Sequence, residues 1–442
     1  MSVELHVDTD YTLEEAMAEA QRCLNCPKPL CRTGCPIENE IPQFIAAMAK
    51  GNFGEADEII RHRSNLPSIC GRVCPREKQC EGACVLNRAG KHIHIGRLER
   101  FAADFVATHQ DVKKIRPVKK DQGKVAIIGS GPAGLAAAGD LAKAGYEVTV
   151  FEAQTEAGGV LVFGIPQFRL DKELVRREVK ALEREGVTFV TNTAVGPQKT
   201  IDSLFEEGYQ AVLAGIGTSR PADISMPGLD KKGVLQAVAL LTLVQLSLNG
   251  SVPDSALPVQ AGDEVVVIGG GNVAIDAART AVRRGAKVTI AYRRGQAQMP
   301  ALPSEYAEAV AEGVETSFYS APHEVVGDEV ATGLRCERME PTEDGSLKAT
   351  GEYFDIPANK IVLAIGHQPN DMLLGAGNEL EGDRKGYLLT KEEPYYGMTN
   401  REGVFAAGDI VHQPATVVLA MREGKRVAQG MIQYMKDKKV AE

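Results

Sequence analysis

Three features are scarce or absent in this chain of 442 residues, and each absence excludes a class of protein. There is no excess of basic residues: the net charge is −9 and the pI about 5.6, which disfavours nucleic-acid binding by bulk electrostatics. No stretch approaches the roughly 20 apolar residues that span a bilayer. The N-terminus, Met1 to Thr12, is acidic and polar, so no secretory signal is expected. We therefore expect a cytoplasmic protein without membrane or nucleic-acid partners.

Cysteine is absent outside residues 23–84 except for Cys336, which lies in a polar stretch and is interpreted as a bystander. The chain beyond residue 84 therefore has no Cys-x2-Cys pair, and dithiol chemistry of the thioredoxin-reductase kind has no residues there. The eight histidines show no metal-binding spacing.

The other eight cysteines form two dense groups of four. The first is Cys23-x2-Cys26-x4-Cys31-x3-Cys35, and the second is Cys70-x3-Cys74-x5-Cys80-x3-Cys84. In a cytosolic protein, cysteines this clustered indicate metal ligands more than disulfides. Thiolates select soft metals, and runs of this kind commonly hold iron–sulfur clusters. Two structural zinc sites are the alternative, although zinc ribbons usually pair short Cys-x2-Cys knuckles and these spacings fit that pattern poorly.

The length predicts two to four domains, and the pattern of residues changes along the chain. Thr12 and Glu15 form a capping box for a helix to about Arg22. Residues 23–110 are typical of helices and loops, and Ile115 to Asp121 is typical of a linker. An α/β pattern follows, with strands at 125–128 and 147–152 and a second copy at 265–268 and 287–292, about 140 residues later. This duplication predicts two doubly wound sheets.

The first copy carries a dinucleotide-binding turn, Gly129-Ser-Gly131-Pro-Ala-Gly134, between a strand and a helix. Its first glycine allows the tight turn, its second lets a pyrophosphate approach the backbone, and its third lets helix and strand pack closely. The helix N-terminus supplies N–H groups and partial positive charge. Glu152 ends the next strand, where a carboxylate accepts from ribose hydroxyls and repels a 2′-phosphate. FAD or NAD fits this site and NADP does not; a turn without any ligand is the alternative.

The second copy carries the turn Gly269-Gly270-Gly271-Asn272-Val273-Ala274, in which alanine replaces the third glycine. The next strand ends in Tyr292-Arg293-Arg294 instead of an acid. Guanidinium groups at this position can clamp a 2′-phosphate, which favours NADP(H) over NAD(H). The alternative is a solvated surface pair of arginines.

The tail, Val404 to Lys436, predicts a strand, a Gly408-Asp409 turn and a helix that starts at Pro414-Ala-Thr416. Asp409 could hold the ribitol of FAD, and the helix N-terminus could face the flavin ring. As a lone motif, Gly-Asp is weak.

Taken together, these motifs resemble those of the small (beta) subunit of bacterial glutamate synthase and, equally, the N-terminal electron-input half of dihydropyrimidine dehydrogenase. The resemblance covers essentially the whole chain. It includes both cysteine groups, Gly158-Gly-Val-Leu-Val-Phe-Gly-Ile-Pro166 with Arg169, the Gly-Gly-Gly-Asn turn, Arg293-Arg294 and the Gly408-Asp409 tail. It implies an α/β fold with two Rossmann-like domains in the glutathione-reductase arrangement, preceded by a helical iron–sulfur domain. The implied boundaries are 1–120 for two [4Fe–4S] clusters, 121–225 with 367–442 for FAD, and 226–366 for NADPH.

The resemblance also implies individual ligands. Cys23, Cys26, Cys31 and Cys84 would bind one cluster, and Cys35, Cys74 and Cys80 the other. The fourth ligand of the second cluster would come from Ile95-Gly-Arg-Leu-Glu99, so Glu99 is the candidate, with Cys70 competing. The implied contacts of FAD and NADPH, none of them catalytic, are Gly129, Gly131, Pro132, Ala133, Gly134, Glu152, Gly159, Leu161, Ile165, Arg169, Gly270, Gly271, Asn272, Val273, Arg293, Arg294, Gly366, Gly408, Asp409 and Thr416.

By the same resemblance, the chain would be the NADPH-dependent electron-input subunit of a hetero-oligomer. Hydride would pass from the nicotinamide to the flavin, and single electrons would pass through the clusters. The sequence shows no amidotransferase cysteine at its start and no barrel-like region, so the electrons should leave for another chain. An FMN-containing glutamate synthase subunit is the first expectation. The alternatives are an FMN dihydropyrimidine dehydrogenase subunit, a ferredoxin-coupled bifurcating transhydrogenase, a self-sufficient diaphorase, and an assembly subunit with inert nucleotide folds.

Overall fold

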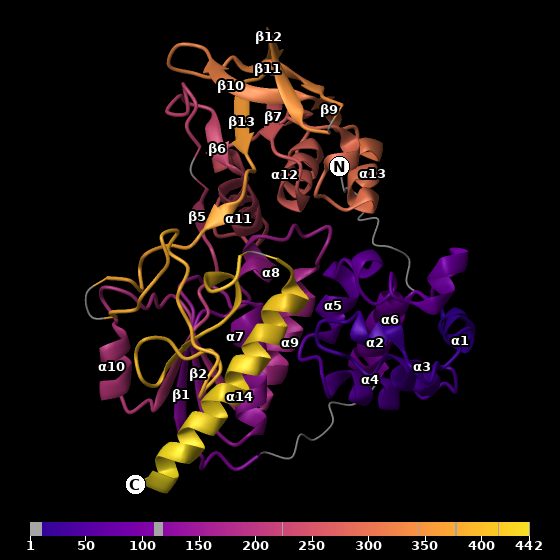
Figure 1. The fold of residues 1–442 in the computed structure, drawn as a ribbon, viewed down its shortest axis with the longest axis vertical. Helices are drawn as coiled ribbons and strands as arrows, with labels where there is room; N and C mark the ends of the chain where they lie inside the picture. The colour runs from indigo at the N-terminus through magenta and orange to yellow at the C-terminus, as the bar shows by residue number, and fades with distance from the viewer. Residues whose placement is uncertain are drawn as a thin grey trace. The chain divides into compact units, whose positions relative to one another are not determined.

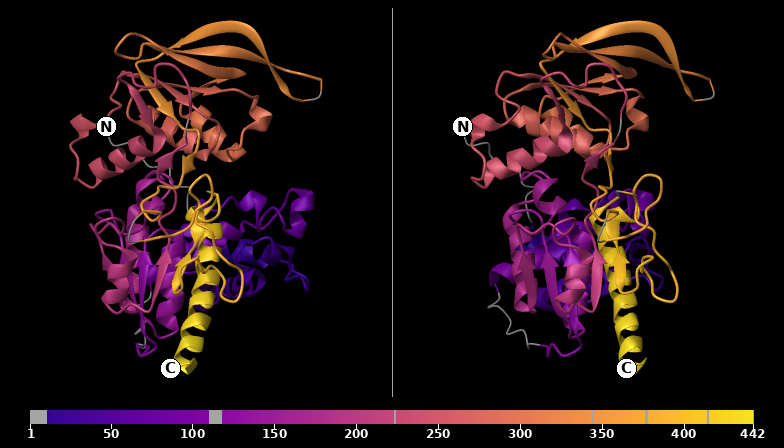
Figure 2. Two further views of the ribbon diagram at one scale, coloured as in Figure 1. Left: turned by 60° about the vertical axis from the view of Figure 1, so that its left-hand side comes forward. Right: turned by 90° about the vertical axis from the view of Figure 1, so that its left-hand side faces the viewer.

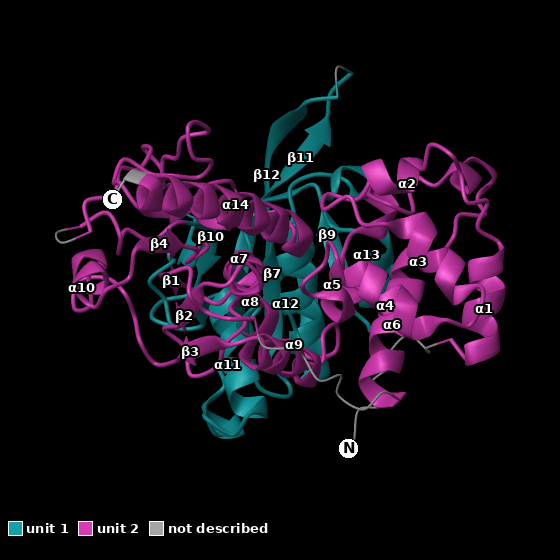
Figure 3. Ribbon diagram, turned by 90° about the horizontal axis from the view of Figure 1, so that it is seen from below, with its two compact units in different colours: residues 1–4, 163–166, 219–368 teal, residues 5–162, 167–218, 369–442 magenta. Residues whose placement is uncertain are grey.

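The computed structural model describes residues 11–109, 118–222, 224–343, 345–375, 378–413 and 415–441. These residues form two compact units, coloured separately in Figure 3. The described part of unit 1 consists of Phe163–Pro166 and Ser219–Gln368, and unit 2 contains the rest. Residues 115–117 of the expected linker lie outside the described residues, as do residues 1–10. Within the described ranges, no helix is both long enough and apolar enough to cross a membrane.

Unit 2 begins with the cysteine-bearing segment, which is helical as predicted (Figure 1). The expected capping box is present, because Thr12 Oγ1 accepts from Glu15 N while Glu15 Oε2 accepts from Thr12 N at 2.7 Å. The helices are α1 (Leu13–Gln21), α2 (Leu30–Thr33), α3 (Ile41–Met48), α4 (Phe53–Arg61), α5 (Pro67–Val73) and α6 (Ile95–His109), with short 3-10 turns at Arg76–Lys78 and Val85–Ala89. Their core is apolar and contains Phe44, Ile60 and Leu98, each shielded completely from solvent.

The rest of unit 2 is a parallel sheet covered by helices. Its strand order is β15-β4-β1-β2-β3, and every neighbouring pair is parallel. The strands are β1 (Lys124–Ile128), β2 (Glu147–Phe151), β3 (Val187–Val190), β4 (Ala211–Ala214) and β15 (Val404–Ala406). The helices are α7 (Pro132–Lys143), α8 (Val160–Phe163), α9 (Lys172–Arg184), α10 (Ile201–Glu206) and α14 (Val417–Ala441). The first two strands lie where the sequence predicts them.

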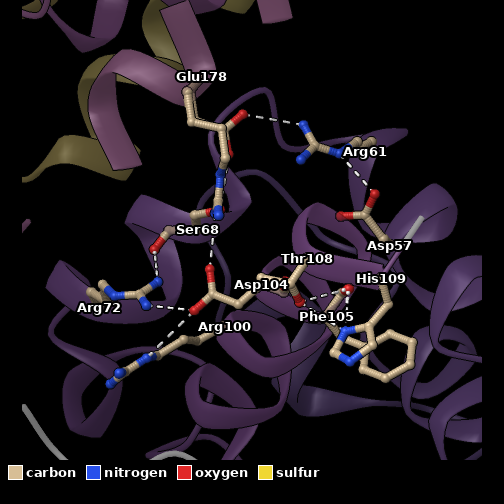
Figure 4. Close-up of polar contacts among 11 residues, drawn as sticks. Asp57, Arg61, Ser68, Arg72, Arg100, Asp104, Phe105, Thr108, His109 and Glu178 are labelled. Carbon is tan, nitrogen blue, oxygen red and sulfur yellow. Dashed lines mark hydrogen bonds and ion pairs between the residues drawn. The ribbon is translucent and has the colours of Figure 1, made fainter. Parts of the chain in front are cut away.

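Buried polar contacts fasten the cysteine-bearing helices to α9 (Figure 4). Glu178 of α9 is 2% exposed and accepts hydrogen bonds from Ser68 Oγ at 2.9 Å and Arg61 Nη1 at 3.2 Å. Arg177 donates to Ser68 Oγ at 2.6 Å and to Asp104 Oδ1 at 2.8 Å. A buried carboxylate is tolerated only when it is paired and hydrogen-bonded, so these contacts favour one docked position of the helices.

A second polar cluster fastens the same helices to α14 and α7. Lys425 Nζ donates to Asn65 Oδ1 at 3.0 Å and to both oxygens of Asp140, at 2.8 and 2.9 Å. Asn65 Nδ2 in turn donates to Ala136 O at 2.8 Å. The helix α14, yellow in both views of Figure 2, runs along α7, and Gly424 makes this approach possible because a Cβ there would lie 2.2 Å from Ala133 O. The last helix therefore connects the cysteine-bearing segment to the first dinucleotide turn.

Unit 1 contains the second parallel sheet, with the strand order β6-β13-β7-β8-β9. The strands are β6 (Val234–Gln236), β7 (Glu264–Ile268), β8 (Lys287–Tyr292), β9 (Glu315–Phe318) and β13 (Lys360–Leu363). Helices α11 (Ala237–Leu248), α12 (Asn272–Arg283) and α13 (Pro303–Ala311) accompany them. A short antiparallel pair, β5 (Arg220–Pro221) with β14 (His367–Gln368), closes the unit. The two predicted doubly wound sheets are confirmed.

An antiparallel sheet that the sequence pattern does not predict connects β9 to β13. It consists of β10 (Ser320–Val326), β11 (Gly333–Pro341) and β12 (Leu347–Pro357). The side chains of β12 are all exposed or partly exposed, so its sequence shows no run of buried residues. Leu334 and Cys336 of β11 are fully buried beneath this sheet, which places Cys336 in a packing role.

Candidate cofactor sites

The first dinucleotide turn has the backbone geometry that its three glycines predict. Gly129 has φ +95°, a left-handed value that favours glycine. A Cβ on Gly134 would lie 2.1 Å from Gly129 O, so this glycine allows α7 to pack closely on the turn. A Cβ on Gly131 would meet no atom within 4 Å, which leaves the backbone open to a ligand. Pro132 and Ala133 begin α7, whose N-terminal N–H groups face this opening.

Glu152 lies at the end of β2 beside this turn, buried at 6% exposure. Its Oε2 accepts from Ser130 N at 3.0 Å and from the Ser130 hydroxyl, while Oε1 accepts from Gln154 N at 2.8 Å. Ser130 Oγ accepts from Gly158 N at 2.9 Å and so connects the carboxylate to the next loop. These donors fix the carboxylate at the position where a ribose hydroxyl would reach it.

The C-terminal motif reaches the same turn through Ala133. A Cβ on Gly408 would lie 2.9 Å from the Cβ of Ala133, so Gly408 brings Asp409 against the start of α7. Burial raises the pKa of the Asp409 carboxyl, and a hydrogen bond from the backbone of Ala415 partly offsets this shift. Thr416 caps α14, because its Oγ1 accepts from Leu419 N at 3.3 Å. Pro414, which was expected at the start of this helix, lies outside the described residues.

The loop after β2 also folds back onto the turn. Gly159 has φ +53°, and a Cβ there would lie 2.9 Å from Gly131 Cα. Leu161, fully buried in α8, accepts a hydrogen bond at its carbonyl from Lys172 Nζ at 2.9 Å. Ile165 and Arg169, both partly exposed, follow on this segment.

The second turn, in unit 1, has a similar backbone arrangement with different side chains. Gly269 has φ +144°, and a Cβ on Gly270 would lie 2.4 Å from the ring of Tyr292. Gly271 has no atom within 4 Å of its Cβ position, as at Gly131. Asn272 and Val273 begin α12, and Asn272 Oδ1 accepts from Leu302 N at 3.0 Å. The turn is therefore held on one side and open on the other.

Arg293 and Arg294 follow β8 directly, and both are exposed. In the ranges that the structure describes, neither guanidinium forms an ion pair. Two unpaired cations here leave room for an anionic group beside the open Gly271. Gly366, another predicted contact, lies between β13 and β14 at φ +109°, and its carbonyl accepts from Ala222 N at 3.0 Å.

Four thiols line one small recess in the cysteine-bearing segment. Cys23 and Cys26 come from the loop after α1, Cys31 from α2, and Cys84 from the residue before Val85–Ala89. Burial raises the pKa of Cys31 to about 11, and the neighbouring Cys23 is the next cause. The structure thus brings together the first predicted ligand set, although Cys84 is more than fifty residues from its partners.

The second predicted set gathers around Glu99. Burial is the main cause that raises the pKa of Cys35 to about 12, followed among the nearby charges by that of Glu99. Burial likewise raises the pKa of Cys80, with Cys35 and Glu99 as the next causes. Cys74 has a raised pKa first because of its hydrogen bond with Cys70, then because of burial.

Glu99 and Cys70, the two candidates for the last ligand, have different surroundings. The Oε1 atom of Glu99 is enclosed and accepts no hydrogen bond from the described residues, although the residue as a whole is partly accessible. Burial raises the pKa of this carboxyl to about 8. Cys70 is 3% exposed, and its thiol contacts Met421 Sδ of α14 at 3.5 Å. The carboxylate has an unsatisfied oxygen, and the thiol already has a partner.

These donor sets fit iron–sulfur clusters chemically. Burial is the main cause that raises the pKa of Cys31, Cys35 and Glu99, because it disfavours their charged forms, and a bound cationic centre would stabilise those forms. Among the side chains that the structure describes, no three from His, Cys, Asp and Glu come together in a group that could hold a single metal ion.

Three residues at these sites were not anticipated from the sequence. Ser130 occupies a variable position of its motif, and only its contact with Glu152 shows its role. Lys172 is 1% exposed, although a lysine in an amphipathic helix is expected to face solvent. Met421 belongs to a long helix whose sequence gives no sign of the contact with Cys70.

Two family models match the chain. The model described as dihydropyrimidine dehydrogenase domain II, 4Fe-4S cluster, matches residues 4–111. The model described as pyridine nucleotide-disulphide oxidoreductase matches residues 92–203 and 123–424. The second match covers well over half of the chain and contains both dinucleotide turns.

Two relatives match nearly the whole of this chain. The glutamate synthase [NADPH] small chain of Halomonas elongata is 37% identical over 437 residues, which are 96% of this chain and 92% of that relative. The putative oxidoreductase UacF of Escherichia coli is 38% identical over 435 residues, 95% of this chain but 67% of that relative. Among solved structures, Mycobacterium tuberculosis FprA in complex with NADPH has a TM-score of 0.59 at 22% identity, covering 74% of this chain and 86% of that one. This structural likeness supports the fold.

Removing both guanidinium groups after β8 tests their contact with a 2′-phosphate. We expect Arg293→Ala with Arg294→Ala to raise the KM for NADPH by at least about tenfold and to leave the KM for NADH within about twofold, since hydrogen bonds to charged groups contribute about 1.5–3 kcal/mol. Lys287→Ala, at the opposite end of β8, is the matched control. Steady-state dye reduction measures both constants, and equal effects on the two nucleotides would refute the assignment.

Separate alanine variants distinguish Glu99 from Cys70 as the last ligand. We expect Glu99→Ala to lose the EPR signal of one cluster and about half of the bound iron, while the other cluster remains. Cys70→Ala should keep both signals, and Cys336→Ala controls for loss of a distant buried thiol. Loss of a cluster in Cys70→Ala but not in Glu99→Ala would reverse the assignment.

Proposed function

The chain belongs to the glutamate synthase small-chain family of pyridine nucleotide oxidoreductases, and on that premise we propose that it is the electron-input subunit of an NADPH-dependent glutamate synthase. It is an oxidoreductase, and FAD, NADPH and [4Fe–4S] clusters are the cofactors typical of its family. Its acceptor would be an FMN-containing large subunit that converts glutamine and 2-oxoglutarate to glutamate. The two chains would form a hetero-oligomer in the cytoplasm.

One observation carries this proposal: two different ligand sets and two different dinucleotide turns occur together in one chain. Unit 2 would hold FAD at Gly129–Gly134 and Glu152, with Asp409 on the ribitol and α14 behind the flavin. Unit 1 would hold NADPH at Gly270–Val273, with Arg293 and Arg294 on the 2′-phosphate. When bound, FAD exchanges a hydride for single electrons, which iron–sulfur clusters can pass on.

The side chains of this chain would then bind and orient the cofactors and select between nucleotides, and none of them would act as a general acid or base. Glu152 repels a 2′-phosphate at the first turn, and the arginine pair favours it at the second, so each nucleotide is directed to its own sheet. The ligands Cys23, Cys26, Cys31 and Cys84 would hold one cluster, and Cys35, Cys74, Cys80 and Glu99 the other. We propose that residues 1–120 bind the clusters, residues 121–225 with 367–442 bind FAD, and residues 226–366 bind NADPH.

Reconstitution with an FMN-containing glutamate synthase large chain tests the proposal. We expect glutamate to form from glutamine and 2-oxoglutarate in step with anaerobic NADPH oxidation, and only when both chains are present. The same assay with uracil and a dihydropyrimidine dehydrogenase FMN subunit is the control, because one matching family model carries that name. NADPH-dependent dye reduction without glutamate, from a large chain active with another small chain, would refute the glutamate synthase assignment.

A further inference from the structure

A lysine side chain is buried at the start of α9. Lys172 is 1% exposed, and its Nζ donates to Leu161 O and to Leu170 O, each at 2.9 Å. Both leucines are completely shielded from solvent. A buried ammonium destabilises a fold unless it is hydrogen-bonded, and an apolar side chain of similar length would avoid that cost. The ammonium supplies what an apolar side chain could not, which is a link between two backbone carbonyls.

These two carbonyls stand at the ends of one stretch of chain, which we call the 161–170 segment. The backbone N–H of Lys172 donates to Gln167 Oε1 at 3.3 Å, and Gln167 Nε2 donates to Asp171 Oδ1 at 3.0 Å, so the segment is also tied to the start of α9. Buried carbonyls need donors, and without the ammonium each end of the segment would lose one. Lys172 therefore holds the two ends of the segment together.

The 161–170 segment adjoins the first dinucleotide turn. It follows Gly159, where a Cβ would lie 2.9 Å from Gly131 Cα. The middle of the segment, Phe163–Pro166, belongs to unit 1, in which Phe163 O accepts from Thr242 Oγ1 of α11 at 3.2 Å. The segment thus starts beside the turn that would bind FAD, and its middle belongs to the unit that would bind NADPH.

From these contacts we propose that Lys172 is a positioning residue for the reduction of FAD by NADPH: it holds the 161–170 segment in the conformation in which hydride transfer is fast. The rate of such a step depends on the placement of the reacting atoms, and a displacement of about 1 Å can lower it about 100-fold. Lys172 acts through the backbone of the segment, so the binding of NADPH at Gly270–Val273 does not depend on it. The proposal rests on the proposed function, because it assigns a role in the step by which electrons enter.

Removing the ammonium tests this role in the FAD-bound protein. Lys172→Met keeps a long unbranched side chain without the donors, and Lys180→Met makes the same substitution at an exposed position of α9. In anaerobic stopped-flow reduction by NADPH, we expect Lys172→Met to lower the limiting rate at least about tenfold and to leave the half-saturating NADPH concentration within about twofold. Lys180→Met should match the unmodified protein in both constants.

Limited digestion with trypsin follows the 161–170 segment itself. Arg169 lies in the segment, and cleavage after it requires local opening of the chain. Mass spectrometry should show this cleavage at least about tenfold faster in Lys172→Met than in the unmodified protein or in Lys180→Met, since opening is no longer opposed by the two hydrogen bonds. Neither measurement uses a large chain, so failure to make glutamate would refute the glutamate synthase assignment and leave this test intact.

An unchanged limiting rate or an unchanged cleavage rate in FAD-bound Lys172→Met would overturn the proposal, as would an equal fall of the limiting rate in Lys180→Met. If Lys172→Met does not fold or binds no FAD, Thr242→Val decides, because it removes the donor to Phe163 O in the same segment. We then expect a limiting rate at least about threefold lower at an unchanged half-saturating concentration. An unchanged limiting rate in Thr242→Val, or an unmodified chain that NADPH does not reduce, would overturn the proposal.

Discussion

The position of the cysteine-bearing segment depends on the packing of α5 against α9 and α14, and buried polar contacts hold it there. Glu178 is 2% exposed and accepts hydrogen bonds from Ser68 and Arg61 of the cysteine-bearing segment. Lys425 is satisfied by Asn65 and Asp140. An unpaired charge on Glu178 or Lys425 would destabilise the folded chain at these buried positions. The hydrogen bonds that satisfy these charges also hold Cys70 against Met421. The cysteine-bearing segment is therefore packed as part of unit 2.

The two nucleotide turns have a similar backbone arrangement, although they are proposed to bind two different cofactors. In each turn one glycine, Gly131 or Gly271, has no atom near its Cβ position and is open to a ligand. A helix begins directly after this glycine in both turns. The difference lies one strand away, where β2 ends in the buried Glu152 and β8 ends in exposed Arg293 and Arg294. We therefore propose that charge at the strand end, rather than the shape of the turn, separates a flavin nucleotide from a phosphorylated nicotinamide nucleotide.

Local patterns predicted the parts of the fold that local physics determines. The capping box at Thr12, the strands before each glycine turn and the duplication follow from short-range rules, and the structure has them. The meeting of Cys84 with Cys23, Cys26 and Cys31 came from resemblance, because spacing alone does not show which distant loops adjoin. The sheet β10–β12 escaped prediction because β12 lacks a buried face, and Lys172 because a charged side chain in an amphipathic helix is expected to face water.

The central claim is that NADPH, flavin and clusters form one connected electron path within this chain, and an anaerobic NADPH titration followed by visible absorbance tests it most directly. The account predicts a brown protein whose flavin band bleaches as NADPH is added, together with a decrease of the broad iron–sulfur absorption beneath it. A colourless protein, or a yellow protein that NADPH does not bleach, would contradict the account and leave only the fold.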